Sequence, residues 1–246
     1  SGSLEPTFSR PVFPVAELTP LSERQLPLEI QLRDEATLEN FLAESPAQPV
    51  VAALQSGVEA VIYLYGPAGC GKSHLLQAGC HLAGSNALYL PLAELGQYRP
   101  EDVLQGVENL ALVCLDDIDQ VLGNADWELA LFNLYNRARE QGCRLLVAGN
   151  AAPRVLCVDL PDLRSRLSWG IVYQLAASDD AHKARILRFR ASRRGLQMPQ
   201  EVASYITSRA PRALDQLLQL LVRLDRASLS EQRALSIPFV KKTLGW

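Results

Sequence analysis

The clearest chemical pattern lies in the segment "GPAGCGKSHLL", which starts at Gly66 and fits the spacing G-x-x-x-x-G-K-[ST]. The glycines let backbone N–H groups curl around phosphate oxygens, Lys72 reaches the β and γ phosphates, and Ser73 offers its hydroxyl to Mg²⁺. An apolar run precedes the segment and a helical pattern follows it, as a phosphate-binding loop requires. The sequence therefore predicts a site for ADP or ATP with Mg²⁺. The predicted contacts are Gly66, Pro67, Ala68, Gly69, Cys70, Gly71, Lys72, Ser73 and His74.

A phosphate loop needs an acid for its metal ion, and the segment "LALVCLDDIDQ" supplies two. Asp116 and Asp117 follow an apolar run, at the strand end where open α/β sheets bind their ligands. We expect Asp116 to hold Mg²⁺ together with Ser73, and Asp117 to orient or activate an attacking water. An acidic turn without a ligand is the alternative, and the phosphate loop disfavours it.

Two further polar residues are candidates for contact with the nucleotide. Asn150 ends the apolar run of "RLLVAGNAAP" and could touch the γ phosphate or the water; an ordinary turn is the alternative. Arg212 follows Pro211 in the predicted first turn of a helix, where a cation opposes the helix dipole. We expect Arg212 to sense bound phosphate, and full solvent exposure is the alternative.

Composition excludes several classes of protein. The longest apolar runs, such as 60–65, have six residues, too few for the roughly 20 that cross a bilayer. The opening Ser1-Gly2-Ser3 resembles a cloning remnant rather than a targeting signal, so we expect a cytoplasmic protein without a membrane anchor. The five cysteines contain no C-x-x-C pair, which indicates reduced thiols.

Charge is distributed unevenly along the chain. Residues 1–180 hold 11 Lys/Arg and 23 Asp/Glu, a balance of -12, whereas residues 181–246 hold 13 and 4, a balance of +9. The basic C-terminal unit could attract phosphates, nucleic acid or an acidic protein face, or its arginines could simply solvate helices.

Short apolar runs alternate with helical patterns up to residue 177, which predicts a parallel sheet covered by helices on both faces. The predicted strands are 61–65, 87–90, 111–115, 145–148 and 171–175. An amphipathic helix between the third and fourth strands is expected to be capped by Asp126 and ended by Gly142. The remaining predicted helices are 180–194, 199–209, 211–227 and 237–244.

These patterns predict three parts of the chain. Residues 1–24 carry four prolines and are expected to form a flexible tail. Residues 25–177 are expected to form an α/β nucleotide-binding domain with a parallel sheet flanked by helices. Residues 178–246 are expected to form a small all-helical lid domain.

The segment "PDLRSRLSWG" places Arg164 and Arg166 before Trp169 and a predicted strand. Together with "GPAGCGKSHLLQA", "LVCLDDID", "DWELALFNLYNR", "ASRRGL" and "LDRASLSEQRALSIPFVKKTLGW", it makes residues 25–246 resemble AAA+ P-loop ATPases. The resemblance is greatest to the family related to the replication initiator DnaA, and within it to the short Hda branch. Such proteins have the α/β AAA+ domain and the helical lid.

The resemblance also implies roles for single residues. Arg166 matches the arginine finger, which would act in trans on ATP held by DnaA, and Arg212 matches the second sensor. Residues 25–32, "QLPLEIQL", resemble the peptide that binds the DNA polymerase sliding clamp (the β subunit), through Gln25, Leu26 and Leu28. This peptide departs from the commoner Q-L-[SD]-L-P-L form because its proline comes earlier and Glu29 lies within it. From the alternation of its apolar residues alone, an edge strand is the alternative.

The expected function is therefore to stimulate, with the clamp, hydrolysis of DnaA-bound ATP and so restrain re-initiation of replication. Asp117 replaces the glutamate usual in AAA+ motors, and Asn150 is an atypical first sensor, so at most weak intrinsic ATPase activity is expected. Sequence for a DNA-binding domain is missing after Trp246, so we expect weak or no direct DNA binding. A self-assembling AAA+ ATPase or helicase loader, or a DNA-binding initiator that uses the basic lid, are the alternatives; self-association stays open.

Overall fold

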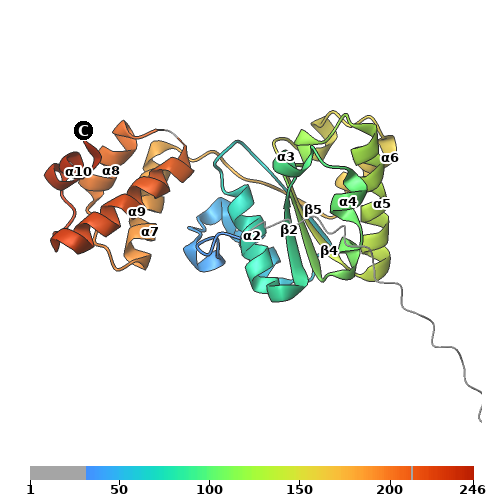
Figure 1. Cartoon of the computed structure of the whole chain (residues 1–246), viewed down its shortest axis with the longest axis horizontal. Coiled ribbons are helices and arrows are strands. Elements are labelled where there is room, and N and C mark those ends of the chain that lie inside the picture. Colours follow the sequence, from blue (N-terminus) through green and yellow to red (C-terminus); the bar gives the residue numbers. More distant parts are fainter. Residues whose placement is uncertain (1–31, 212) are drawn as a thin grey trace, which may run out of the picture.

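The computed structural model describes residues 32–211 and 213–246. The predicted tail, most of the predicted clamp-binding peptide (Gln25, Leu26 and Leu28 included) and Arg212 lie outside these residues. Within them the chain forms an α/β unit followed by a helical unit (Figure 1).

Five parallel strands form one sheet in the order β2-β3-β4-β1-β5. The strands are β1 (Val61–Tyr65), β2 (Ala87–Pro91), β3 (Leu112–Asp116), β4 (Arg144–Gly149) and β5 (Ile171–Gln174). The predicted fold class is confirmed, and strand ends differ from the prediction by one residue at most. Because β4 lies between β1 and β3, the phosphate loop and Asp116 follow strands that flank a common neighbour.

Helices cover both faces of the sheet (Figure 1). One face carries α1 (Gln48–Ser56) and α2 (Lys72–Ala83), and the other carries α3 (Leu92–Leu95), α4 (Pro100–Leu104), α5 (Ala125–Gln141) and α6 (Pro161–Leu167). Strand β1 shows the alternation, since Ile62 and Leu64 pack with α2 whereas Tyr63 packs in the core of α5. Short 3₁₀ turns cover Leu38–Asn40, Ser45–Ala47, Gly84–Asn86, Val107–Asn109, Ile118–Gln120 and Pro153–Val155.

Helix α5 begins differently from the prediction. Its N-cap is Asn124, whose side-chain oxygen accepts hydrogen bonds from the backbone N–H groups of Asp126 at 3.0 Å and Trp127 at 3.2 Å. The prediction of Asp126 as the cap was therefore wrong, because Asp126 already lies in the first turn. Gly142 ends the helix in the left-handed region, as expected.

The helical unit contains α7 (Asp180–Arg193), α8 (Gln200–Arg209), α9 (Leu214–Glu231) and α10 (Ile237–Leu244). The predicted start of the third helix at Pro211 was wrong, since α9 begins at Leu214. Ala210 is extended because the residue before a proline avoids the helical region, so α8 ends at Arg209 and cannot continue into Pro211.

Ion pairs join the helical unit to the segment before α1. Glu35 accepts from both Arg190 and Arg194, and Glu44 accepts from Arg185 Nε at 2.5 Å. Arg190 is only 5% exposed, so its pair with Glu35 compensates a buried charge. Across the described residues, every helix is too short or too polar to cross a membrane.

Candidate functional site

The phosphate loop connects β1 to α2, with Gly66 at φ 155° and Gly71 at φ 101°. These φ values favour glycine, and a side chain at either position would also come too close to neighbouring atoms. A Cβ at Gly66 would lie 2.4 Å from the carbonyl oxygen of Leu175, and one at Gly71 would lie 2.9 Å from Phe41 Cε2. The loop is thus closely packed between the end of β5 and the segment before α1.

Lys72 lies in the first turn of α2 and folds back over the loop. Its Nζ donates hydrogen bonds to the carbonyl oxygens of Gly66 at 2.8 Å and Pro67 at 3.1 Å. The side chain is only 9% exposed, so the ammonium group is desolvated and can exchange these carbonyls for phosphate oxygens. Ser73 follows it in the same turn and is half-buried.

Asp116 ends β3 and is 1% exposed. Its Oδ2 accepts from the hydroxyl of Tyr89 at 2.7 Å, and its Oδ1 accepts from the backbone N–H of Asp117 at 3.0 Å. Burial, reinforced by Asp116, raises the pKa of Tyr89, so that phenol stays a donor. Tyr89 was missed from the sequence, because it comes from β2, which pairs with β3.

Asp116 lies at the end of β3 and Ser73 in the first turn of α2, and both side chains carry oxygen atoms of the kind that Mg²⁺ prefers. In the described residues, no three His, Cys, Asp or Glu side chains gather as a metal site. Mg²⁺ usually binds proteins through one or two side-chain oxygens, with phosphate and water completing its shell.

Asp117 adopts the left-handed conformation, with φ 53° and ψ 46°, and is half-buried. Burial raises its pKa, and the neighbouring Asp116 and Asp119 add to the effect, while Lys72 opposes it. Asn150 is exposed, and its backbone N–H donates to Asp119 Oδ1 at 2.9 Å. The ends of β3 and β4 are thereby tied together on the side of the sheet that carries the phosphate loop.

His74 points toward the segment before α1. Its Nε2 lies 2.7 Å from the carbonyl oxygen of Thr37, and its ring lies 5.5 Å from that of Phe41. Burial lowers the pKa of His74 to about 4, so the neutral ring donates this hydrogen bond. The imidazole is thus occupied by contacts with Thr37 and Phe41, so only the backbone of His74 is left for the predicted contact with a nucleotide.

A pocket of about 220 Å³ adjoins the phosphate loop at Cys70. Its walls come from the segment before α1, the end of β5 and helix α7. The lining residues are Phe41, Leu42, Glu44, Pro46, Ala47, Cys70, Gln174, Leu175, Ala176, Ala177, Asp179, His182 and Arg185. An apolar slot beside a phosphate loop, with polar groups at its rim, has the chemistry of a nucleobase site.

Arg166 lies near the C-terminal end of α6, with its Cζ 4.2 Å from the ring centroid of Trp169 and 5.7 Å from that of Phe132. Within 32–211 and 213–246 its guanidinium forms no ion pair or hydrogen bond. Arg164, in contrast, donates to the carbonyl oxygen of Val158. Among the residues that the structure describes, only Arg164 of the two arginines has a hydrogen-bond acceptor for its guanidinium.

Glu128 fixes the position of α6, a role that the sequence did not reveal. This carboxylate on α5 is 1% exposed and accepts backbone N–H hydrogen bonds from Gly123 at 2.8 Å, Asp159 at 3.1 Å and Leu160 at 2.6 Å. Leu160 is the N-cap of α6. The loop that leads into the helix of Arg166 is therefore anchored on the helix that packs beneath it.

Comparison with protein-family models gives two matches. Residues 62–168 match the AAA model, described as the ATPase family associated with various cellular activities, and residues 180–244 match the lid domain of Hda. A protein of Haemophilus influenzae, described only as uncharacterized, is 41% identical over 228 residues, which cover 90% of this chain and 98% of the relative.

Solved structures share the fold at lower identity. Domain III of the Thermotoga maritima replication initiation protein DnaA has a TM-score of 0.70 and 20% identity, covering 87% of this chain and 98% of that chain. AMPPCP-bound DnaA from Aquifex aeolicus has a TM-score of 0.66 and 21% identity, covering 81% and 68%. The branch migration motor RuvB of Thermotoga maritima has a TM-score of 0.62 and 18% identity, covering 85% and 71%.

Proposed function

Because this chain belongs to the Hda family of DnaA-related AAA+ proteins, we propose that it supplies Arg166 to ATP held by DnaA and, with the DNA sliding clamp, stimulates its hydrolysis. The observation that carries this proposal is the guanidinium of Arg166, which is placed on an aromatic ring without an acidic partner in the described chain. In this role the protein would act in the cytoplasm and restrain re-initiation of replication.

Arg166 suits this chemistry for physical reasons. A guanidinium stays charged at any physiological pH and presents forked N–H donors that match phosphate oxygens. Stacking on Trp169 occupies the face of the group and leaves its N–H edges available. An arginine that reaches a γ phosphate from a neighbouring molecule typically raises turnover by about 10³- to 10⁵-fold.

The chain's own nucleotide would act mainly as a structural ligand. Lys72 and the loop glycines would hold the phosphates, Ser73 and Asp116 would hold Mg²⁺, and the base would enter the pocket beside Cys70. That pocket has walls from both the α/β unit and α7, so a bound ADP or ATP would join the two units. Arg212 would contact the phosphates as the second sensor. The support for this role is indirect: Leu214, two residues later, lies close to the phosphate loop, since a Cβ built on Gly69 would be 4.0 Å from the Cβ of Leu214.

Weak intrinsic hydrolysis fits the position of Asp117. An aspartate is one methylene shorter than the glutamate usual in AAA+ motors. Burial and two neighbouring acids raise the pKa of Asp117, and its shorter side chain would hold its carboxylate farther from an attacking water than a glutamate would. We therefore expect ADP to remain bound after a slow turnover.

The sliding clamp would be recruited by the peptide around Gln25, Leu26 and Leu28. An extended segment with a polar contact and spaced aliphatic side chains suits an apolar pocket on a partner. Replacing Gln25 and Leu26 by alanine should weaken clamp binding. An unchanged binding isotherm would remove this peptide from the proposal.

The central experiment is a reconstituted assay with ATP-bound DnaA, DNA-loaded clamp and the purified protein. Arg166→Ala should lose the stimulation of ATP hydrolysis, while the matched control Arg164→Ala should retain it, since the guanidinium of Arg164 donates to the carbonyl oxygen of Val158. Full stimulation by Arg166→Ala would refute the proposed role.

A self-assembling ATPase is the second candidate. It is supported by the phosphate loop, over which Lys72 folds, and by the buried Asp116 at the end of β3. ATP turnover by the isolated protein separates the two. Turnover that rises steeply with protein concentration and needs Arg166 would favour self-assembly. Slow turnover that is independent of concentration would favour the regulator.

A further inference from the structure

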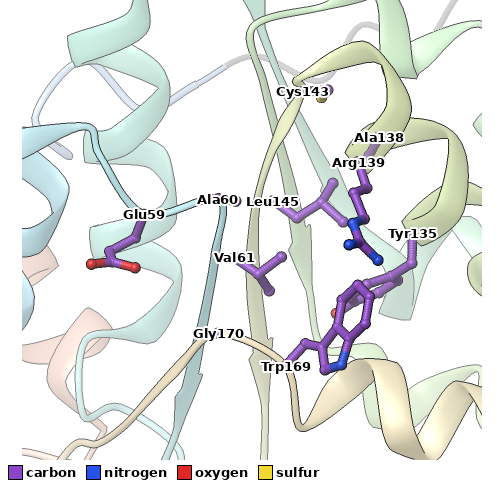
Figure 2. A pocket seen from close by; sticks show the side chains of 10 residues that line it. All are labelled: Glu59, Ala60, Val61, Tyr135, Ala138, Arg139, Cys143, Leu145, Trp169 and Gly170. Atoms are coloured by element: carbon purple, nitrogen blue, oxygen red, sulfur yellow. The ribbon is translucent and has the colours of Figure 1, made fainter.

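A second pocket lies at the amino edge of the sheet, away from the phosphate loop. Its volume is about 200 Å³ (Figure 2). The lining residues are Glu59, Ala60, Val61, Tyr135, Ala138, Arg139, Cys143, Leu145, Trp169 and Gly170. Val61 starts β1 and Gly66 follows its end, so about 16 Å of strand separates this pocket from the nucleotide site.

The pocket is mostly apolar but contains one buried donor with no partner. Tyr135 on α5 is 3% exposed, and in the described residues its hydroxyl has no hydrogen-bond partner. The neighbouring phenol of Tyr63 shows the contrast, because it donates to the carbonyl oxygen of Ala151 at 3.0 Å. An unpaired buried hydroxyl costs free energy that a ligand acceptor would recover.

A cation stands at the rim of the same pocket. Arg139 Cζ lies 4.6 Å from the ring centroid of Trp169, and none of the described residues pairs with its guanidinium. Glu59 is the one acid among the ten lining residues, and Figure 2 shows its carboxylate pointing away from Arg139. The rim is therefore positive where the pocket opens.

We propose that this pocket binds a small monocarboxylate with a single aromatic ring or a branched aliphatic body. The apolar walls from Val61, Ala138 and Leu145 would contact the body of the ligand. Its carboxylate oxygens would accept hydrogen bonds from Tyr135 and pair with Arg139. A volume of about 200 Å³ is below the range of drug-sized sites, so one ring is the size that fits.

Trp169 also lines this pocket. Its half-exposed indole lies against the guanidinium of Arg139, and both residues line the pocket together with Tyr135 (Figure 2). Because the hydroxyl itself is buried, we expect the residues around it, Trp169 among them, to shift when a carboxylate reaches it. Burial raises the pKa of Tyr135, so the phenol remains protonated and donates at physiological pH.

The test uses the full chain and three probes, benzoate and phenylacetate as carboxylates and benzyl alcohol as the neutral analogue. Titration calorimetry should show saturable binding of one equivalent of carboxylate, at least tenfold tighter than the alcohol. In ¹H–¹⁵N spectra the indole resonance of Trp169, assigned with Trp169→Phe, should shift during the titration.

Two variants locate the contacts. Tyr135→Phe should weaken carboxylate binding by about tenfold or more, as expected for a lost hydrogen bond to a charged acceptor, without lowering the stability of the fold. Arg139→Gln should remove the preference for carboxylate over alcohol. The matched controls are Tyr65→Phe, whose hydroxyl contacts Gln174, and Arg137→Gln, whose guanidinium pairs with Glu108; both should bind as the wild type.

Three results would overturn the proposal. The first is an absence of saturable carboxylate binding to the wild type at millimolar concentrations. The second is equal affinity for the carboxylates and the alcohol. The third is unchanged carboxylate affinity in both Tyr135→Phe and Arg139→Gln.

Discussion

Arg166 rests its guanidinium on the indole of Trp169, with 4.2 Å between Cζ and the ring centroid. The backbone ties the two residues together as well, since the N–H of Trp169 donates to the carbonyl oxygen of Arg166 at 2.9 Å. Cation–π contacts are worth about 0.5–2 kcal/mol, depending on exposure. The tight turn and the ring therefore hold the cation in one place without neutralising it.

Replacing Trp169 should impair the proposed arginine finger. Without the ring, Arg166 samples more rotamers, and we expect Trp169→Leu to lower stimulation of DnaA-bound ATP hydrolysis by about threefold to tenfold. Trp169→Phe keeps an aromatic face and should lose less. ADP affinity of the isolated protein should stay unchanged in both variants, and full stimulation by Trp169→Leu would contradict the positioning role.

The carboxylate of Glu128 should be essential for the loop before α6. Glutamine offers one acceptor and places an N–H₂ group among three backbone donors, in a site that is almost completely buried. We expect Glu128→Gln to lower the free energy of unfolding by about 3 kcal/mol, measured by urea denaturation. The exposed Glu140→Gln on the same helix is the control and should stay within about 0.5 kcal/mol of the wild type. A similarly small change for Glu128→Gln would show that the loop does not depend on this anchor.

Nucleotide binding should stabilise the protein through Lys72. A ligand at 100 times its Kd adds about 2.7 kcal/mol, which for a chain of this size raises the Tm by about 5–10 °C. We expect Lys72→Ala to abolish this rise in thermal melts with ADP and Mg²⁺. Lys242→Ala, which removes an exposed ion pair with Glu231 on the lid, should keep it. If ADP raised the Tm of Lys72→Ala as much as that of the wild type, the nucleotide would not depend on Lys72 and would bind elsewhere than at this loop.

The sequence was sufficient for the sheet because each strand is a short apolar run between turn signals. Gly66 and Gly71 were also informative, since their spacing belongs to one loop geometry, and the structure places that loop between β1 and α2. The sequence pattern therefore carried both the fold class and the position of the loop within it.

Contacts across the fold could not be predicted in the same way. Tyr89 and Asp116 are 27 residues apart and meet only because β2 pairs with β3. Glu128 looks like any acid in the first turn of an amphipathic helix, although it is buried by a loop 31 residues later. Helix starts were uncertain for a local reason, since Asn124 and Asp126 are both good caps and only the observed hydrogen bonds distinguish them.

The largely buried imidazole of His74 should make stability depend on pH. Its pKa is about 4 in the folded protein, against an ordinary value of 6.5, because burial disfavours the charged ring. Between these values the unfolded chain binds a proton that the folded chain does not. Stability is therefore full above pH 6.5 and falls as the pH drops toward 4, by about 3 kcal/mol from this group.

His74→Gln isolates that contribution, because glutamine can still donate to the carbonyl oxygen of Thr37 but does not titrate. Other acidic groups affect both proteins equally, so the difference in unfolding free energy between wild type and variant reports His74 alone. Urea denaturation at several pH values between 7 and 4 should show this difference shifting steadily in favour of His74→Gln. A constant difference across that range would mean that the ring is not held neutral by its burial beside the phosphate loop.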